Sequence, residues 1–202
     1  ILLNGSPKSK GCTYTALKII ENELINEGIE VKFYEVGNKP VIGCTGCTAC
    51  RKLGKCVHDD LVNEVSKEIE SADGFIVGSP VHYAAASGAA TSFLDRLFYS
   101  TDKNQLRHKF GASIVSCRRG GASATFDQLN KYFTINEMPI VSSVYWNQIH
   151  GNTPEEVVQD LEGVRTMKVL ARNMAYLIKC KEAAKNVPLP KLVPVERTNF
   201  IR

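Results

Sequence analysis

The chain has 202 residues, of which 44% are hydrophobic and 23% charged, the usual balance of a soluble globular protein. Its net charge of +4 comes from 25 basic and 21 acidic residues spread along the chain, which argues against nucleic acid or membrane partners. No apolar run approaches the ~18 residues that a membrane helix needs, and residue 1 already fits a core strand, so no signal peptide is expected. Seven cysteines, an odd number, indicate reduced thiols and a cytoplasmic location.

Strand-like and helix-like segments alternate, which predicts a parallel sheet covered by helices on both faces. The expected strands are 1–3, 31–36, 74–79, 112–116 and 139–145. The expected helices are about 13–27, 60–71, 87 through at least 97, 122–133 and 153–181. This order predicts a doubly wound five-stranded sheet, in which a ligand binds beyond the carboxyl ends of the strands, where the winding direction reverses.

The last predicted helix begins at Thr153, followed by a proline and two glutamates, which is typical of a helix start. It continues for about 28 residues, or roughly 42 Å at 1.5 Å per residue. That is longer than the sheet, so we expect its far end to reach a partner subunit. We expect one domain over residues 1–185 and an extended, Val- and Pro-rich arm over 186–202.

Loop one, residues 4–15, combines hydroxyls, two lysines and a glycine with the start of a helix. Outward-pointing N–H groups and the helix dipole suit an anion there. A mononucleotide P-loop would need Gly-Lys-Ser/Thr, but Gly11 precedes Cys12 and Thr13, and the dinucleotide pattern Gly-x-Gly-x-x-Gly is absent. A phosphate monoester site remains, with a helix cap that binds nothing as the alternative.

Two further loops are expected at the same edge of the sheet. Loop two, residues 78–88, has small residues that allow a flat ring to approach the backbone, and Tyr83 could stack on it. Loop three, residues 116–123, places two arginines beside two glycines at a helix start, which can present positive charge and N–H donors together. The alternatives are an ordinary strand-to-helix turn and a basic surface loop.

Three motifs occur in order at family-like spacings, namely Asn4-Gly-Ser-Pro, Gly78-Ser-Pro-Val-His-Tyr and Phe93-Leu-Asp-Arg. Over nearly the whole chain they resemble the NAD(P)H-dependent FMN reductase family, in its branch near the iron–sulfur flavoproteins. The resemblance implies a flavodoxin-like fold, bound FMN and a homodimer or homotetramer. It also implies hydride transfer from NADH or NADPH and delivery of electrons to a small acceptor, such as a flavin, quinone, nitro compound or metal ion.

The resemblance implies FMN contacts in all three loops. The phosphate would lie against Ser6, Lys8, Cys12, Thr13, Tyr14 and Thr15. The flavin ring would lie against Pro80, Val81, His82, Tyr83 and Ser87, with Ser116, Arg118, Gly120 and Gly121 along its other edge. The family usually has Asn where Cys12 stands, so one hydrogen-bonding side chain of the phosphate loop is missing here. No catalytic side chain is expected, because the flavin carries the chemistry.

The cysteine loop, residues 37–59, is too long for a plain turn, which indicates function. It contains Cys44, Cys47, Cys50 and Cys56, and thiolates spaced by two residues can converge on a metal or cluster. The spacing resembles the compact motif that holds a [4Fe–4S] cluster in iron–sulfur flavoproteins. Zinc, and thiols without metal, remain alternatives. We prefer an NAD(P)H-dependent FMN reductase; the alternative function is an electron carrier that receives electrons from ferredoxin.

Overall fold

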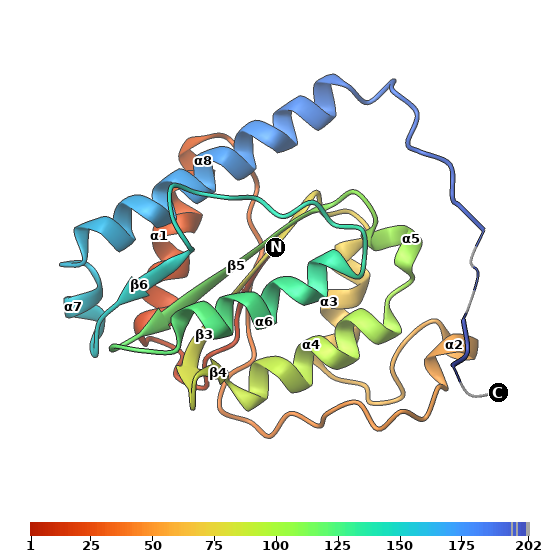
Figure 1. The fold of residues 1–202 in the computed structure, drawn as a ribbon, viewed down its shortest axis with the longest axis horizontal. Coiled ribbons are helices and arrows are strands. Elements are labelled where there is room, and N and C mark those ends of the chain that lie inside the picture. The colour runs from red at the N-terminus through yellow and green to blue at the C-terminus, as the bar shows by residue number, and fades with distance from the viewer. Residues whose placement is uncertain (195, 197, 201–202) are drawn as a thin grey trace.

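A computed structural model describes residues 1–194, 196 and 198–200, and shows a parallel sheet between two layers of helices (Figure 1). Its five parallel strands are β1 (Leu2–Asn4), β2 (Phe33–Glu35), β3 (Gly74–His82), β5 (Phe110–Cys117) and β6 (Gln148–His150). They lie in the order β2-β1-β3-β5-β6, and a two-residue strand β4 (Ala85–Ala86) pairs antiparallel with the end of β3. The doubly wound five-stranded parallel sheet predicted from the sequence is confirmed.

The longer helices divide between the two faces. One face is covered by α1 (Cys12–Asn26) and α8 (Leu161–Ala183). The other is covered by α3 (Leu61–Ile69), α4 (Gly88–Ser100) and α6 (Ala122–Thr134). Single-turn helices lie in the connections, namely α2 (Cys50–Leu53), α5 (Lys103–Leu106) and α7 (Pro154–Val157). This arrangement leaves the loops after β1, β3 and β5 at one edge of the sheet.

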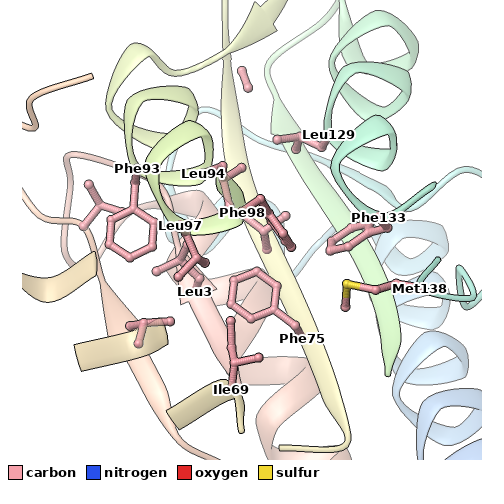
Figure 2. Close-up of a cluster of buried hydrophobic side chains, with 14 of the residues drawn as sticks. Leu3, Ile69, Phe75, Phe93, Leu94, Leu97, Phe98, Leu129, Phe133 and Met138 are labelled. Atoms are coloured by element: carbon pink, nitrogen blue, oxygen red, sulfur yellow. The ribbon is translucent and has the colours of Figure 1, made fainter. Parts of the chain in front are cut away.

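Alternation along the central strands sends neighbouring side chains into different cores. On β3, Phe75 packs with the α3, α4 and α6 side chains, whereas Ile76 packs under α1 and α8. Figure 2 shows the first core, in which the rings of Phe75, Phe98 and Phe133 meet edge to face. Because both faces of the sheet are covered, the central strand β3 is buried continuously from Gly74 to Ser79, which suits its largely apolar sequence.

The fifth strand lies later in the chain than predicted. The strand expected at 139–145 is wrong, because only Ile140 pairs there, in an isolated bridge to Gly111. Beyond it Ser143 forms a local turn, in which its hydroxyl bonds to the Tyr145 carbonyl at 2.8 Å and to Asn147 Oδ1 at 2.7 Å. Pairing with β5 resumes only at β6, where Gln148–His150 lie beside Val115 to Cys117.

The single helix expected at 153–181 is also wrong in its extent. It begins as predicted, with the Thr153 hydroxyl accepting from the Glu156 amide at 3.3 Å, but α7 ends at Val157. Asp160 then starts α8, because its Oδ1 accepts from the Gly163 amide at 2.9 Å while its Oδ2 accepts from the His150 amide at 2.7 Å. This carboxylate turns the chain between the two helices and anchors the turn to β6.

The remaining predicted elements agree with the structure to within a few residues. Strand β3 runs three residues beyond the predicted end, to His82, and makes the hairpin with β4 that the sequence did not indicate. The part of the expected arm at 188–194 has no helix or strand, and residues 195, 197, 201 and 202 of that arm lie outside the described residues. None of the described helices has the length and apolar character required to cross a membrane.

Candidate functional site

The three predicted loops meet at the carboxyl edge of the sheet. The Gly5 amide donates to the Gly78 carbonyl at 2.8 Å, which joins loop one to loop two. The Ser87 hydroxyl donates to the Gly5 carbonyl at 2.6 Å and strengthens the same junction. Loop one also joins loop three, because the hydroxyls of Thr13 and Ser116 share a hydrogen bond of 2.7 Å. The structure therefore brings together the loops that the sequence singled out.

The start of α1 offers amide donors to a ligand. Its N-cap is Gly11, and no side chain caps the helix there, so the first amides of this 15-residue helix are open to another acceptor. Ser6 lies nearby in the same loop, 4% exposed, and its Oγ accepts from the Lys8 amide at 3.1 Å, which leaves its own proton free to donate. These donors fit the phosphate group of FMN.

Three other side chains of loop one have protein partners. Thr15 Oγ1 donates to the Gly11 carbonyl at 3.2 Å, and the Tyr14 ring packs edge-on against Phe33. Cys12 Sγ lies 3.6 Å from the Gly151 carbonyl, and burial raises the pKa of Cys12, so this side chain is a neutral thiol. The Thr15 amide donates to the Gly11 carbonyl at 3.0 Å, so of these three residues only Cys12 and Tyr14 contribute backbone amides to the open end of the helix.

Loop two ends in a tight hairpin whose tip contacts loop three. Tyr83 and Ala84 adopt left-handed conformations, with φ of 52° and 59°, and the Tyr83 ring is fully exposed. Gly121 of loop three has φ of 89°, and a Cβ there would lie 2.7 Å from Ala84 Cα and 2.9 Å from Val81 Cγ1. Only glycine permits this approach. Pro80 and His82 lie in the same end of β3, on the hairpin's first strand.

Ser87 and Asn4 shape the loops from within. Ser87 is buried and caps α4, with its Oγ accepting from the Ala90 amide at 3.1 Å as well as donating to loop one. Asn4 is also buried, and it bridges Glu35 Oε1 at 3.0 Å and the Ser6 amide at 3.1 Å. Asn4 begins one of the sequence motifs, but the sequence assigned it no role, although a polar residue at the end of an apolar strand is a usable signal. Both side chains fix loop one.

The remaining residues of loop three form its open rim. Arg118 and Gly120 are exposed, beside the buried Ser116 at the end of β5. The N-cap of α6 is Gly121, where no side-chain oxygen caps the helix. Positive charge and backbone N–H groups therefore face outward together at this edge. Such a combination favours an anionic ligand or a ligand that gains negative charge.

The cysteine loop forms a second candidate site. Its four cysteines are all free thiols and, with Arg96, line one pocket of about 20 Å³. Within residues 1–194, 196 and 198–200, no three His, Cys, Asp or Glu side chains are arranged around a single metal ion. The four cysteines therefore border the same pocket, but their side chains do not converge on the position of one metal ion. Cysteine thiolates are the usual ligands of iron–sulfur clusters, so the donor set fits such a group.

Contacts inside the loop favour thiolate at one of these positions. The pKa of Cys47 is lowered, first by the Ala49 amide and then by the Thr45 hydroxyl. Cys56 accepts a hydrogen bond from Arg96 Nε over 3.3 Å. Arg96 belongs to the Phe93–Arg96 motif, yet the sequence did not indicate that it would contact the cysteine loop. The sequence offers no signal for this contact, because Arg96 and Cys56 lie 40 residues apart and the burial of Arg96 is visible only in the fold.

The first 153 residues match the family model described as NADPH-dependent FMN reductase. The chain belongs to this family. Members of the FMN reductase family are flavin-dependent oxidoreductases that bind FMN, which agrees with the donors at the start of α1. The family named from the resemblance is thus confirmed.

Two relatives carry a more specific name. An iron–sulfur flavoprotein of Methanocaldococcus jannaschii is 31% identical over 88% of this chain and 95% of its own length. An iron–sulfur flavoprotein of Methanosarcina thermophila is 28% identical over 87% of this chain and 93% of its own length. The branch of the FMN reductase family expected from the motifs is therefore represented among the similar proteins.

Solved structures establish the fold of this family member independently. RosB with a bound riboflavin-5'-phosphate derivative has a TM-score of 0.70 and 15% identity, covering 100% of this chain and 91% of RosB. An archaeal flavodoxin has a TM-score of 0.60 and 14% identity, covering 88% of this chain and 96% of its own. At these identities the likeness concerns the fold alone. The fold is flavodoxin-like, as predicted.

Proposed function

We propose that this FMN reductase-family protein is an iron–sulfur flavoprotein that carries electrons. It binds FMN at loops one to three and a [4Fe–4S] cluster at Cys44, Cys47, Cys50 and Cys56. A ferredoxin-like protein supplies electrons, and a small acceptor receives them. The observation that carries the proposal is the single pocket lined by all four thiols. Near-full-length relatives named iron–sulfur flavoproteins support it.

The proposal changes the preferred function from the one favoured by sequence. The sequence contains both the cluster motif and the reductase motifs, and alone it favours the reductase, because a cysteine-rich loop does not by itself require a metal. Four cysteine residues that line one pocket are better explained by a shared ligand than by four unrelated structural thiols. Free cysteines that serve packing usually lie among apolar side chains, whereas Cys44 and Cys47 are exposed.

The chain's own residues would bind and orient the two groups. The open amides of α1 and the Ser6 hydroxyl hold the phosphate, while the β3–β4 hairpin and loop three form the two sides of the ring site. Arg118 supplies positive charge at the open rim. When bound, the cluster supplies one-electron exchange, and FMN supplies transfer of one or two electrons.

One helix connects the two sites. At its start, Ser87 bonds to loop one, and towards its other end Arg96, Tyr99 and Ser100 line the cysteine pocket. The 13 residues of α4 span about 20 Å at 1.5 Å per residue. Helix α4 therefore sets the spacing between flavin loops and cysteine pocket within one chain.

An NAD(P)H-dependent FMN reductase is the second candidate function. It is favoured by the match of residues 1–153 to a family model of that description. In this case NADH or NADPH reduces the flavin directly, and a flavin, quinone, nitro compound or metal ion receives the electrons. The cysteine loop would then be free of metal or would hold zinc.

The first experiment is anaerobic reconstitution with iron and sulfide, followed by iron counting and visible spectroscopy. We expect about four irons per chain, because a cubane cluster on four thiolates contains that number. Cys47→Ala should lose them. Cys180→Ala is the matched control, because Cys180 is an exposed thiol on α8, outside the pocket, and this variant should keep its iron. Stoichiometric zinc, or no metal after anaerobic handling, would leave only the reductase.

The second measurement separates the electron donors. Protein containing both groups is mixed with reduced ferredoxin in one series and with NADH or NADPH in another, and reduction is followed spectroscopically. We expect rapid reduction by ferredoxin and little steady-state oxidation of either nicotinamide. Sustained nicotinamide turnover in the Cys47→Ala variant would instead support the second candidate, since that variant retains only the flavin.

A further inference from the structure

Arg96 is the largest side chain that the structure buries completely, with 1% of its surface exposed. It projects from α4 into the wall of the cysteine pocket. Arginine is almost never fully buried unless it is paired, because removing its charge from water is costly. A guanidinium at this position therefore requires a specific set of acceptors.

The surrounding loop supplies an acceptor for every N–H of the guanidinium. Nη1 donates to Asp60 Oδ2 at 2.6 Å and to the Ile42 carbonyl at 3.4 Å. Nη2 donates to Asp60 Oδ1 at 2.9 Å and to the His58 carbonyl at 3.1 Å. The remaining donor, Nε, points at Cys56 Sγ over 3.3 Å. All five donors are used, and one of them is aimed at a predicted cluster ligand.

Asp60 fixes the direction of this contact. It binds the two outer nitrogens as a fork, and its Oδ1 also accepts from the Val62 amide at 3.1 Å, where it caps α3. Burial alone would raise the pKa of Asp60, but hydrogen bonds from Arg96 and from the Val62 amide lower it, so the carboxylate is charged. A paired guanidinium held on both sides cannot rotate away, and Nε stays directed at the sulfur.

We infer that Arg96 is a positioning residue of the cluster site, which orients the Cys56 thiolate and raises the reduction potential of the cluster. The inference rests on the proposed function, because it requires the cluster to be bound. Reduction adds one electron from the ferredoxin-like donor, and that negative charge spreads onto the ligand sulfurs. A hydrogen bond to sulfur and a nearby cation both stabilise the more negative state.

The test is potentiometry of the reconstituted cluster, monitored by electron paramagnetic resonance. We expect Arg96→Gln to lower the reduced-to-oxidised ratio at a fixed potential about tenfold, which is ~59 mV for one electron. Arg96→Lys keeps the charge but loses the paired hydrogen bonds to Asp60, so the shift of the cluster potential should be smaller than in Arg96→Gln. The FMN potential, measured in the same samples, should stay constant because the flavin loops lie at the other end of α4.

Arg51→Gln is the matched control. Arg51 lies in the same loop, but it donates to the Tyr99 hydroxyl at 3.2 Å rather than to a sulfur. Its removal takes one cation from the loop without removing an N–H to sulfur bond. A cluster shift in Arg96→Gln no larger than in Arg51→Gln would overturn the inference.

Asp60→Asn provides a second test with the opposite sign. The amide oxygen can still cap α3 and accept from Nη2, but the amide NH2 replaces the Oδ2 acceptor of Nη1, and the negative charge that balances Arg96 is lost. The cluster potential should therefore rise, because the uncompensated cation of Arg96 stabilises the reduced cluster. If both Arg96 variants fail to hold four irons, this variant decides: a rise supports the inference, and an unchanged potential overturns it.

The outcomes separate this inference from the proposed function. A wild-type chain that binds no iron under anaerobic conditions would overturn the proposed function, and the role of Arg96 with it. A wild-type chain with four irons, together with an unchanged potential in Arg96→Gln, would overturn the role of Arg96 alone.

Discussion

At the residue scale, two hydroxyls of loop one are the sharpest test of the flavin site. The Ser6 proton is free to donate, and the Thr13–Ser116 pair uses only one of its two protons in the shared bond. Hydrogen bonds to a charged group contribute roughly 1.5–3 kcal/mol each. We predict that the double variant Ser6→Ala/Thr13→Ala weakens FMN binding at least about tenfold, since ~1.4 kcal/mol corresponds to that factor.

Titration of the apoprotein with FMN, followed by the quenching of flavin fluorescence, measures this change. Thr166→Ala is the control, because the Thr166 hydroxyl is buried on α8 and bonds to the Glu162 carbonyl of its own helix. Equal affinity in the double variant and the wild type would show that the phosphate binds elsewhere.

We expect Arg118 to affect the reduction potential of FMN more than the affinity for FMN. Its exposed cation lies at the rim of loop three, where a reduced flavin would gain negative charge. Exposed charges interact by about 1 kcal/mol or less, so Arg118→Ala should lower the FMN midpoint potential by roughly 20 mV for two electrons. Arg172→Ala, which removes a cation paired with Glu23 on the α1 side, should leave the potential unchanged. An unaltered potential in Arg118→Ala, with FMN bound, would place Arg118 outside the site.

Residue types and spacing identified the loops that form both candidate sites, but not the contacts between distant segments. Loop one could be recognised because its hydroxyls, lysines and helix start are neighbours in sequence. Arg96 could not, because its partners Ile42, Cys56, His58 and Asp60 lie 36 to 54 residues away. Sequence alone does not give the direction of a long side chain, so its function appears only when α4 is packed against the loop.

At the scale of elements, Gly121 couples loop three to the β3–β4 hairpin. Its left-handed φ and the 2.7 Å approach of a Cβ to Ala84 Cα both oppose any larger residue. Left-handed backbone costs a non-glycine residue roughly 1–2 kcal/mol, and the overlap adds to it. We therefore predict that Gly121→Ala lowers the free energy of unfolding by at least about 1 kcal/mol and weakens FMN binding.

Gly120→Ala is the matched control for stability, because a Cβ at the neighbouring position meets nothing within 4 Å. Urea unfolding of both variants without FMN compares them directly, and we expect Gly120→Ala to fall within about 0.5 kcal/mol of the wild type. Equal stability of the two variants would mean that the hairpin moves freely away from loop three.

The errors in element prediction also have local causes. The segment 139–145 has the β-branched and aromatic composition of a strand, but the Ser143 hydroxyl bonds to Asn147 and turns the chain before it can pair. Helical periodicity continues through residues 153–181, but Asp160 caps a new helix inside it. In both cases one polar side chain overrides the pattern, and the partner that makes this possible is known only from the fold.

At the scale of the whole molecule, exposed apolar side chains predict self-association. They include Val144, Tyr145, Trp146, Val158, Leu161 and Tyr176, all at least 46% exposed, before β6 and along α7 and α8. Large apolar side chains that are exposed in one protomer are often covered by another subunit. We predict a homodimer or homotetramer in light-scattering measurements, and partial dissociation of the Trp146→Glu/Leu161→Glu variant. Glu182→Lys, an exposed charge change on α8, is the control. A monomeric wild type would contradict the prediction.

The bonds at the base of the cysteine loop have a consequence for how it is filled. Arg96 holds the Ile42 and His58 carbonyls, and Asn63 binds both the amide and the carbonyl of Cys56 at 2.9 and 3.0 Å. None of these bonds involves a metal, so the apoprotein should keep the two ends of the loop closed. Fixing the backbone of one residue costs roughly 1–2 kcal/mol in conformational entropy. For the base of the loop, folding of the apoprotein covers this cost before iron binds.

Hydrogen–deuterium exchange of the apoprotein would reveal this preorganisation. The Cys56 amide, bonded to Asn63 Oδ1, should exchange slowly even without iron, whereas amides in the exposed stretch 44–48 should become protected only on reconstitution. In Asn63→Ala the Cys56 amide should exchange quickly, and iron should be taken up more slowly. Cluster insertion would then require little rearrangement of the chain, because the base of the cysteine loop is already ordered when the chain first folds.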